Sequence, residues 1–377
     1  NNKAVQTFTI TRESSMKYTI LNLAILSTML GAGLVQAGGF DRTGQDTSIM
    51  LKEDSMVEIT SVSVNPKITG THGSSATATG EVAPNYSFTN VGFRTNVSDN
   101  FAIGIIQEKP FGANVDYTAG AASSTYVGLK AKVDSSSTTL LTSYDMDNVT
   151  VYGGLKNQSL SASATNPLVA AYTITSTADS SLGYVFGAAI ENPETAMRLA
   201  LTYHSKVNHD IAIVENYTGI SATASTLKVT TPESFNIDFQ TGIAANTLLF
   251  GTIRQAKWSQ MSLCPAQYKA AATVCLKEFK NNVTSYTLGV GRKFSDHWSG
   301  AFTYGREASN DDKVSALSPT NGYNKMGLGV TYTGEQAVVT LGMQKINNGN
   351  VAKTTAVAFD MSNNTTLVTA LKVGFKF

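Results

Sequence analysis

The chain has 377 residues, of which only 15% are charged, and its formal net charge is +1. No basic tract gives it the electrostatic footprint of a nucleic-acid-binding protein, so no nucleic-acid partner is expected. Apolar residues make up 42% of the chain, yet beyond the first 37 residues no run of about 20 predicts a membrane-spanning helix. These features favour one large β structure.

The first 37 residues predict an export signal. Residues 1–15 show no periodicity and precede Met16, and we interpret them as an upstream, non-native extension. From Met16, a lysine is followed by an apolar run that ends in Val35-Gln36-Ala37. A charged start, a short apolar core and a small-residue exit are typical of a secretory signal peptide, here residues 16–37. The mature chain is therefore expected outside the cytoplasm.

The end of the chain shows the pattern of the mature protein. Alternate residues are apolar on one side, where Leu367, Leu371, Phe375 and Phe377 lie, whereas Lys372 and Lys376 lie on the other. Successive side chains of a strand point to opposite faces of a sheet. Strands that are apolar outside and polar inside are typical of a transmembrane β-barrel, which satisfies its backbone hydrogen bonds within lipid.

Fourteen such strands are predicted within residues 55–377. Their approximate ranges are 56–66, 83–97, 100–117, 125–144, 148–163, 171–191, 195–213, 226–244, 247–262, 278–294, 297–309, 322–333, 336–347 and 365–377. Tight turns alternate with longer polar loops, and short periplasmic turns opposite long external loops are the rule in bacterial outer-membrane barrels. We therefore predict a 14-stranded antiparallel barrel in the bacterial outer membrane. Outer-membrane lipids and, through the final Phe377, the barrel assembly machinery are expected partners.

Strand parity predicts which side chains enter the lumen. In the strand 148–163, Val151 and Leu155 face outward, which places Tyr152 and Lys156 inside. The same reasoning turns Arg198 inward. The strand 247–262 does not divide into an apolar and a polar face, because Leu248, Phe250 and Trp258 share parity with Arg254. A β-bulge is expected to turn the side chains of one half of this strand to the other face.

The cysteines Cys264 and Cys275 lie in one loop rich in small residues. In an oxidising compartment they predict a loop disulfide. The alternative is two free thiols. A metal site is not expected, because no histidine lies near them.

No catalytic constellation is visible. The four histidines are expected in loops or at strand ends, and no G-x-S-x-G nucleophile motif occurs. We therefore expect neither an enzyme nor a cofactor. An outer-membrane lipase that uses a serine with His204 or His209 is a weaker alternative.

Two stretches of the chain carry specific motifs. Residues 231–244 have the pattern x-P-x-S-x-N-x-x-x-x-x-G, and the hairpin partner that follows ends in Trp258-Ser259. Residues 288–298 are similar to a G-x-x-Y-x-F-x-D-x-W hairpin. In this order and spacing, the stretches resemble the FadL/TodX (OmpP1) family of outer-membrane transport proteins for long-chain fatty acids and hydrophobic compounds. The start of the mature chain at residue 38 resembles a subgroup with a short N-terminal segment.

The resemblance implies a monomeric barrel whose lumen is plugged by an N-terminal hatch, here the short segment 38–54. A hydrophobic ligand would be caught near the external loops, held in an inner apolar pocket and released sideways through a kink in the third strand. The family's Asn-Pro-Ala hatch motif is absent from this segment.

The third predicted strand contains an interruption that fits such a kink. Pro110 cannot donate to a strand ladder, and Gly112 beside Phe111 is typical of a bulge or bend. We predict a lateral opening at Pro110, Phe111 and Gly112. The alternative places this irregularity at the extracellular rim.

A fatty carboxylate in an apolar cavity needs a cation, because a buried unpaired charge is costly. By position along the strands, Lys156 and Lys280 are similar to the basic residues of the family, and inward-facing Arg198 is a third candidate. Each could instead be a lumen charge paired with Asp238 or Glu191. Apolar contributions to the pocket are expected from four residues: Phe40, Ile49, Met50 and Phe111.

The main rival function is a general diffusion porin, which predicts an open, charged eyelet and ion conductance. Fourteen strands are fewer than the number in typical open porins, and the low charge content argues the same way. A role of the loops as adhesin or phage receptor stays open.

Overall fold

The computed structural model describes residues 40–118, 124–310, 315–351 and 359–377. The predicted upstream extension and signal peptide, residues 1–37, lie outside these ranges. Among the described residues, no helix has the length and apolar character needed to cross a membrane.

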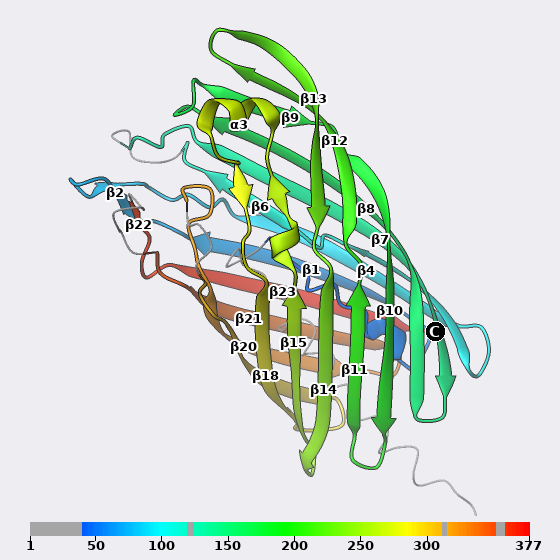
Figure 1. Ribbon diagram of the computed structural model, residues 1–377. Coiled ribbons are helices and arrows are strands. Elements are labelled where there is room, and N and C mark those ends of the chain that lie inside the picture. Colours follow the sequence, from blue (N-terminus) through cyan, green and yellow to red (C-terminus); the bar gives the residue numbers. More distant parts are fainter. Residues whose placement is uncertain (1–39, 119–123, 311–314, 352–358) are drawn as a thin grey trace, which may run out of the picture.

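The strands form a closed antiparallel barrel of 14 barrel strands, as the sequence predicts (Figure 1). Closure is made by β1, Met56–Lys67, which pairs with β4 on one side and with the last strand, β23, on the other. Four barrel strands are each interrupted and consist of two consecutive segments: β5 with β6, β9 with β10, β11 with β12, and β13 with β14.

The remaining elements of the barrel wall are β4 Tyr86–Asn96, β5 Phe101–Glu108, β6 Gly112–Asp116, β7 Lys130–Met146, β8 Val149–Asn166, β9 Tyr172–Ser176, β10 Asp179–Asn192, β11 Met197–His204, β12 Val207–Tyr217, β13 Ile220–Thr231, β14 Ser234–Ala244, β15 Thr247–Ala256, β18 Val283–Lys293, β19 Trp298–Glu307, β20 Tyr323–Thr333, β21 Ala337–Asn348 and β23 Thr365–Lys376. Outside the wall lie η2 Ser48–Leu51, β2 Thr71–His72, β3 Thr77–Ala78, η3 Trp258–Gln260, β16 Ser262–Leu263, α3 Ala266–Ala272, β17 Lys277–Glu278 and β22 Phe359–Asp360.

Side-chain burial follows the predicted alternation. Leu155 is 63% exposed on the outer face, whereas its neighbour Lys156 is 1% exposed on the inner face. In β23, Leu371 is exposed and Lys372 is buried in the same way. An outer face that is apolar suits lipid, and the polar side chains find partners inside.

The expectation of a bulge that re-aims part of the strand 247–262 is wrong. Leu248, Phe250 and Arg254 are all buried on the inner face of β15, in an unbroken register with β18. The apolar residues are stable there because this part of the lumen is filled by packed side chains, including other apolar ones, rather than by water.

The two ends of the barrel differ. Tight turns join β7 to β8 and β14 to β15, where Asp147 and Asn246 adopt the positive φ values of 53° and 58° that such turns use. At the other end, β12 and β13 extend as a long hairpin beside β9 and α3 (Figure 1). Strand therefore occupies most of residues 214–225, which the sequence predicts as a loop. Because outer-membrane barrels have short periplasmic turns and longer external loops, we assign this end to the external side.

Candidate functional site: a gap in the barrel wall and the cavities behind it

The third barrel strand is broken at the predicted kink. β5 ends at Glu108 and β6 begins at Gly112, and both pair with β7. On the other side, the ladder between β4 and β5 ends at the pair Val91↔Gln107. Pro110 has no N–H to donate, so the chain cannot continue the ladder across the break.

Above the break, the wall has a gap between β4 and β6. β4 continues to Tyr86 and still pairs with β1, but no ladder joins residues 86–90 of β4 to β6 in the described chain. Lys109 N donates to Asn90 Oδ1 at 3.4 Å, and Asp116 N donates to Val82 O at 2.9 Å beyond the far end of the gap. We call this opening, between residues 86–90 and 112–116, the β4–β6 gap.

The N-terminal segment pairs with the broken strand. Arg42 N donates to Pro110 O at 2.9 Å, and Gly112 N donates to Phe40 O at 2.7 Å. The Ser135 hydroxyl donates to Phe111 O at 2.8 Å and accepts from Phe111 N at 2.9 Å. The backbone of the kink is thereby satisfied, which it must be at membrane depth.

The kink directs Phe111 inward. Its side chain is 1% exposed, and its ring centroid lies 5.4 Å from that of Trp258. Phe40 packs against the same tryptophan at 6.0 Å. Two of the four predicted pocket residues therefore meet in one aromatic cluster.

Arg42 lies beside the β4–β6 gap. Its guanidinium stands 4.6 Å from the ring centroid of Tyr86 on β4 and reaches Asp134 on β7 at 3.5 Å. A Cβ on Gly112 would lie 2.2 Å from Arg42 Cζ. The glycine at this position therefore makes room for an arginine that bridges the two edges of the gap.

The rest of the N-terminal segment contacts the inner wall at several barrel strands. Asp41 forms an ion pair with Arg254 at 2.6 Å, and Gly44 O accepts from Asn236 Nδ2 at 2.8 Å. Ile49 and Met50 pack against Gly92 and Gly104, where an added Cβ would overlap them. These two predicted pocket residues lie in η2, away from the aromatic cluster.

An apolar cavity of about 40 Å³ lies at the external side of the kink. Phe40 and Val133 line one part of it, and Leu263, Leu276 and Lys277 line another from the loop between β15 and β18. Lys277 is 8% exposed, and its ammonium lies 4.6 Å from the Phe279 ring centroid and donates to Ser318 Oγ at 3.1 Å. A buried cation thus borders an apolar space.

A second cavity of about 80 Å³ lies behind the lower part of the gap and is more polar. Asn90 and Glu108 line it beside the break, and Glu58 and Lys372 line it from β1 and β23. Glu58 and Lys372 form a buried ion pair at 2.8 Å, and Glu108 accepts a hydrogen bond from Thr43.

The structure does not bring the three predicted carboxylate ligands together. Arg198 is held by Glu191 at 3.5 Å, by Leu51 O at 3.3 Å and by Gln240 at 3.3 Å, as the alternative pairing predicts for a lumen charge. Lys156 is buried in the lumen, whereas Lys280 lies on an exposed connection before β18.

Sequence reasoning missed Lys277, which borders the apolar cavity. It stands in a loop and belongs to no long alternating strand, so parity gave no signal. Its position depends on the pairing of β16 with β17.

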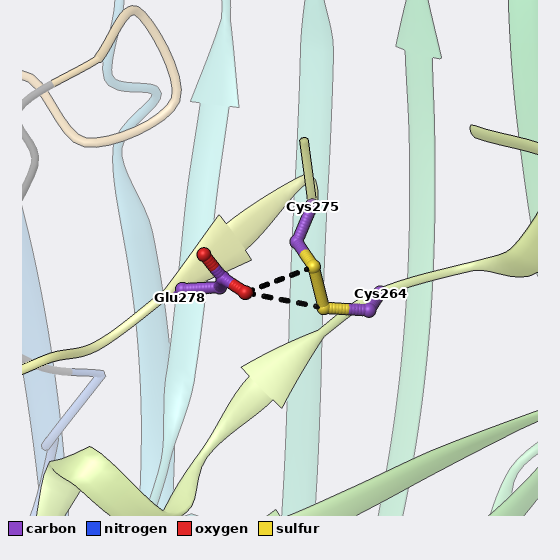
Figure 2. A group of neighbouring side chains, drawn as sticks. All are labelled: Cys264, Cys275 and Glu278. Carbon is purple, nitrogen blue, oxygen red and sulfur yellow. Dashed lines mark hydrogen bonds between the residues drawn. A yellow bond between two sulfur atoms is a disulfide. The ribbon is translucent and has the colours of Figure 1, made fainter. Parts of the chain in front are cut away.

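Cys264 and Cys275 are joined by a disulfide with a Cα–Cα distance of 4.4 Å (Figure 2). Glu278 Oε1 lies 3.2 Å from one sulfur and 3.8 Å from the other. These are residue types that bind metals. With both sulfurs in the disulfide, however, no thiolate is available as a ligand, because a cysteine binds a metal as the reduced, deprotonated thiolate.

In the described chain, His209 is not placed as the base of a hydrolytic site. His209 Nδ1 pairs with Asp179 at 2.8 Å, but its Nε2 lies 3.2 Å from Gln158 Oε1 rather than near a serine hydroxyl. A general base must reach the proton of its nucleophile, and in the described chain His209 does not.

The chain matches the family described as "Outer membrane protein transport protein (OMPP1/FadL/TodX)" over residues 46–377. Its fold is similar to the crystal structure of a Pseudomonas aeruginosa FadL homologue, with a TM-score of 0.70 and 12% identity over 93% of this chain and 98% of that one. It is also similar to the crystal structure of the Pseudomonas putida toluene transporter TodX, with a TM-score of 0.63 and 10% identity over 93% of this chain and 97% of that one. The crystal structure of the Ralstonia pickettii toluene transporter TbuX is similar with a TM-score of 0.62 and 11% identity, over 93% of this chain and 97% of that one. No curated protein matches the chain by sequence.

Proposed function

The chain belongs to the OMPP1/FadL/TodX family of outer membrane transport proteins, and we propose that it takes up long-chain fatty acids by lateral release through the β4–β6 gap. It is a transport channel of the outer membrane and not an enzyme. The observation that carries the proposal is the broken third barrel strand, with an apolar cavity on its external side and a wall gap beside it.

The apolar cavity supports capture of a hydrophobic ligand. Phe40, Val133 and Leu263 line it, and their apolar side chains can pack against an acyl chain. At about 40 Å³ the cavity is smaller than such a ligand, so binding must widen it.

The β4–β6 gap supports sideways exit. An interrupted ladder in lipid is costly unless it borders a lined passage, and here the passage is closed by Arg42 from the N-terminal segment. Residues 40–54 would act as the short luminal plug, and withdrawal of Phe40–Arg42 from Pro110–Gly112 would open the gap. The ligand would then enter the outer leaflet without crossing the lower lumen.

Lys277 supports a ligand with a carboxylate. Its ammonium lies at the border of the apolar cavity, where it can pair with a fatty carboxylate while the chain fills the apolar space. The toluene transporters named above carry a neutral compound. A neutral aromatic hydrocarbon is therefore the second candidate, and it would make no use of this lysine.

The test is uptake of radiolabelled oleate and toluene by cells with and without the protein, and with Lys277→Met. We expect the wild type to raise oleate uptake. In Lys277→Met the apparent affinity for oleate should fall by ~10-fold, because a charge-assisted contact contributes on the order of 1.5 kcal/mol or more. Toluene uptake should not change between the two proteins.

Lys277→Arg is the matched control, because it keeps the cation and should retain most of the oleate affinity. Toluene uptake without oleate uptake in the wild type would replace the fatty acid with a neutral substrate. Uptake of neither compound would contradict the proposed function itself.

A further inference from the structure

The loop between β15 and β18 folds as a small closed unit. Ser262 and Leu263 of β16 pair with Glu278 and Lys277 of β17, and α3 lies between these strands. The disulfide Cys264–Cys275 joins the two arms just above this pairing, across a sequence separation of 11 (Figure 2). We call residues 262–278 the lid.

The lid forms one wall of the apolar cavity. Leu263, Leu276 and Lys277 line the cavity from the lid, and Phe40 and Ile174 line it from other parts of the chain. The lid takes no part in the barrel ladder, since β16 and β17 pair with each other. It holds its own wall of the cavity in place, so the widening that a ligand needs comes from the opposite wall, where Phe40 belongs to the N-terminal segment.

Glu215 anchors the lid to the barrel. This residue lies near the end of β12 and is 1% exposed. Its carboxylate accepts hydrogen bonds from the backbone N–H groups of Gln267 and Tyr268, both at 3.1 Å, and from Tyr172 Oη at 2.8 Å. Ser225 Oγ donates to its second oxygen at 3.1 Å. A buried carboxylate with this many donors holds its partners in one orientation.

Aromatic contacts accompany this anchor. The Tyr268 ring packs edge-on against Tyr172, with ring centroids 4.8 Å apart. Asn166 Nδ2 donates to Tyr268 Oη at 3.0 Å. The lid is thus attached to β8, β9 and β12 through α3, whereas its opposite edge borders the cavity.

We propose that residues 262–278 are a clamped lid whose position sets the affinity of the apolar cavity for its hydrophobic ligand, with Glu215 as the positioning residue and the disulfide as the lock that keeps the lid one unit. The proposal rests on the proposed function. A disulfide restricts the conformations of the loop that it closes, and the Glu215 carboxylate fixes where the closed loop lies. Without either, Leu263 and Leu276 would no longer be held against the cavity.

The test is a binding measurement on purified protein in detergent, with cis-parinaric acid as a fluorescent fatty acid. The variants are Glu215→Ala, the pair Cys264→Ser with Cys275→Ser, and their combination. We expect each change to raise Kd by ~10-fold and to speed dissociation, because the lid would be held less firmly. The combination should weaken binding by much less than the product of the two effects, because both act on the same lid.

Glu215→Gln is the conservative control, since it keeps an acceptor oxygen for the N–H groups of Gln267 and Tyr268, and it should bind closer to wild type than Glu215→Ala does. Every variant should still migrate as a folded barrel on a heat-modifiable gel, because the lid takes no part in the barrel ladder. Wild-type affinity in all variants, additive effects, or loss of the folded barrel together with the affinity would overturn the lid. Failure of the wild type to bind the probe would instead overturn the proposed function, and the lid with it.

Discussion

At the scale of single residues, the charges inside the barrel are held by partners on neighbouring strands or in the N-terminal segment. Lys156 and Arg198 both lie inside, as alternation requires. The sequence left the partner of Arg198 open between Asp238 and Glu191, because the ion pair with Glu191 depends on the register between β10 and β11. Strand parity gave no signal for Lys277, which a short hairpin outside the wall directs toward the cavity.

Lys52 provides a test of this packing by pH. Burial lowers the pKa of Lys52 from its ordinary 10.5 to about 7, and the nearby Glu58 carboxylate limits the drop. Between these values the unfolded chain binds a proton that the folded chain has lost, so this residue makes stability rise with pH across that window. The destabilisation by the buried lysine is complete at pH values below its folded pKa of about 7 and disappears as the pH approaches 10.5.

Lys52→Met should therefore melt at a higher temperature than wild type at about pH 6, and the difference should shrink toward about pH 10. Calorimetry in detergent at several pH values measures this difference in melting temperature. Lys67→Met replaces an exposed lysine of β1 and serves as the control for the loss of one positive charge. A gain that stays constant across the whole range would contradict a lowered pKa at Lys52.

At the scale of elements, the kink at Pro110 could be predicted because proline removes a ladder donor wherever it stands in a strand. Its consequences could not. The gap beside it depends on where the β4–β5 ladder stops, and Phe40–Arg42 pairs with the kink from 70 residues away in the chain, as the Asp41↔Phe111 bridge shows. Such long-range pairing leaves no local sequence pattern.

Closing the β4–β6 gap should abolish uptake. We expect a variant with Arg42→Ala, Pro110→Thr and Gly112→Val to extend the ladder, since threonine and valine favour strands and removal of the arginine makes room at position 112. Oleate uptake should then fall to the level of cells without the protein. The matched control, Arg42→Ala alone, leaves the gap unblocked and should transport at least as well as wild type. Wild-type uptake by the triple variant, with the barrel folded on heat-modifiable gel migration, would exclude the lateral route.

At the scale of the whole molecule, the 14-stranded barrel could be predicted from alternation and from the sequence of short and long connections. Closure follows from the pairing of β1 with β23, which no local pattern contains. Residues 40–54 lie inside the barrel. They contact Arg254, Asn236 and Gly104, which belong to three different barrel strands. In the described chain, side chains of this segment and of the wall pack together inside the barrel, which favours the proposed transporter over an open porin.

Exit of hydrophobic molecules through the wall, with the lumen closed to water, can be measured by two readings on one preparation. Purified protein is reconstituted into bilayers for ion conductance and into vesicles for delivery of radiolabelled oleate. We predict protein-dependent delivery of oleate together with no steady current above that of the bare bilayer. Large steady currents without oleate delivery would exclude lateral release and identify the protein as a general diffusion porin.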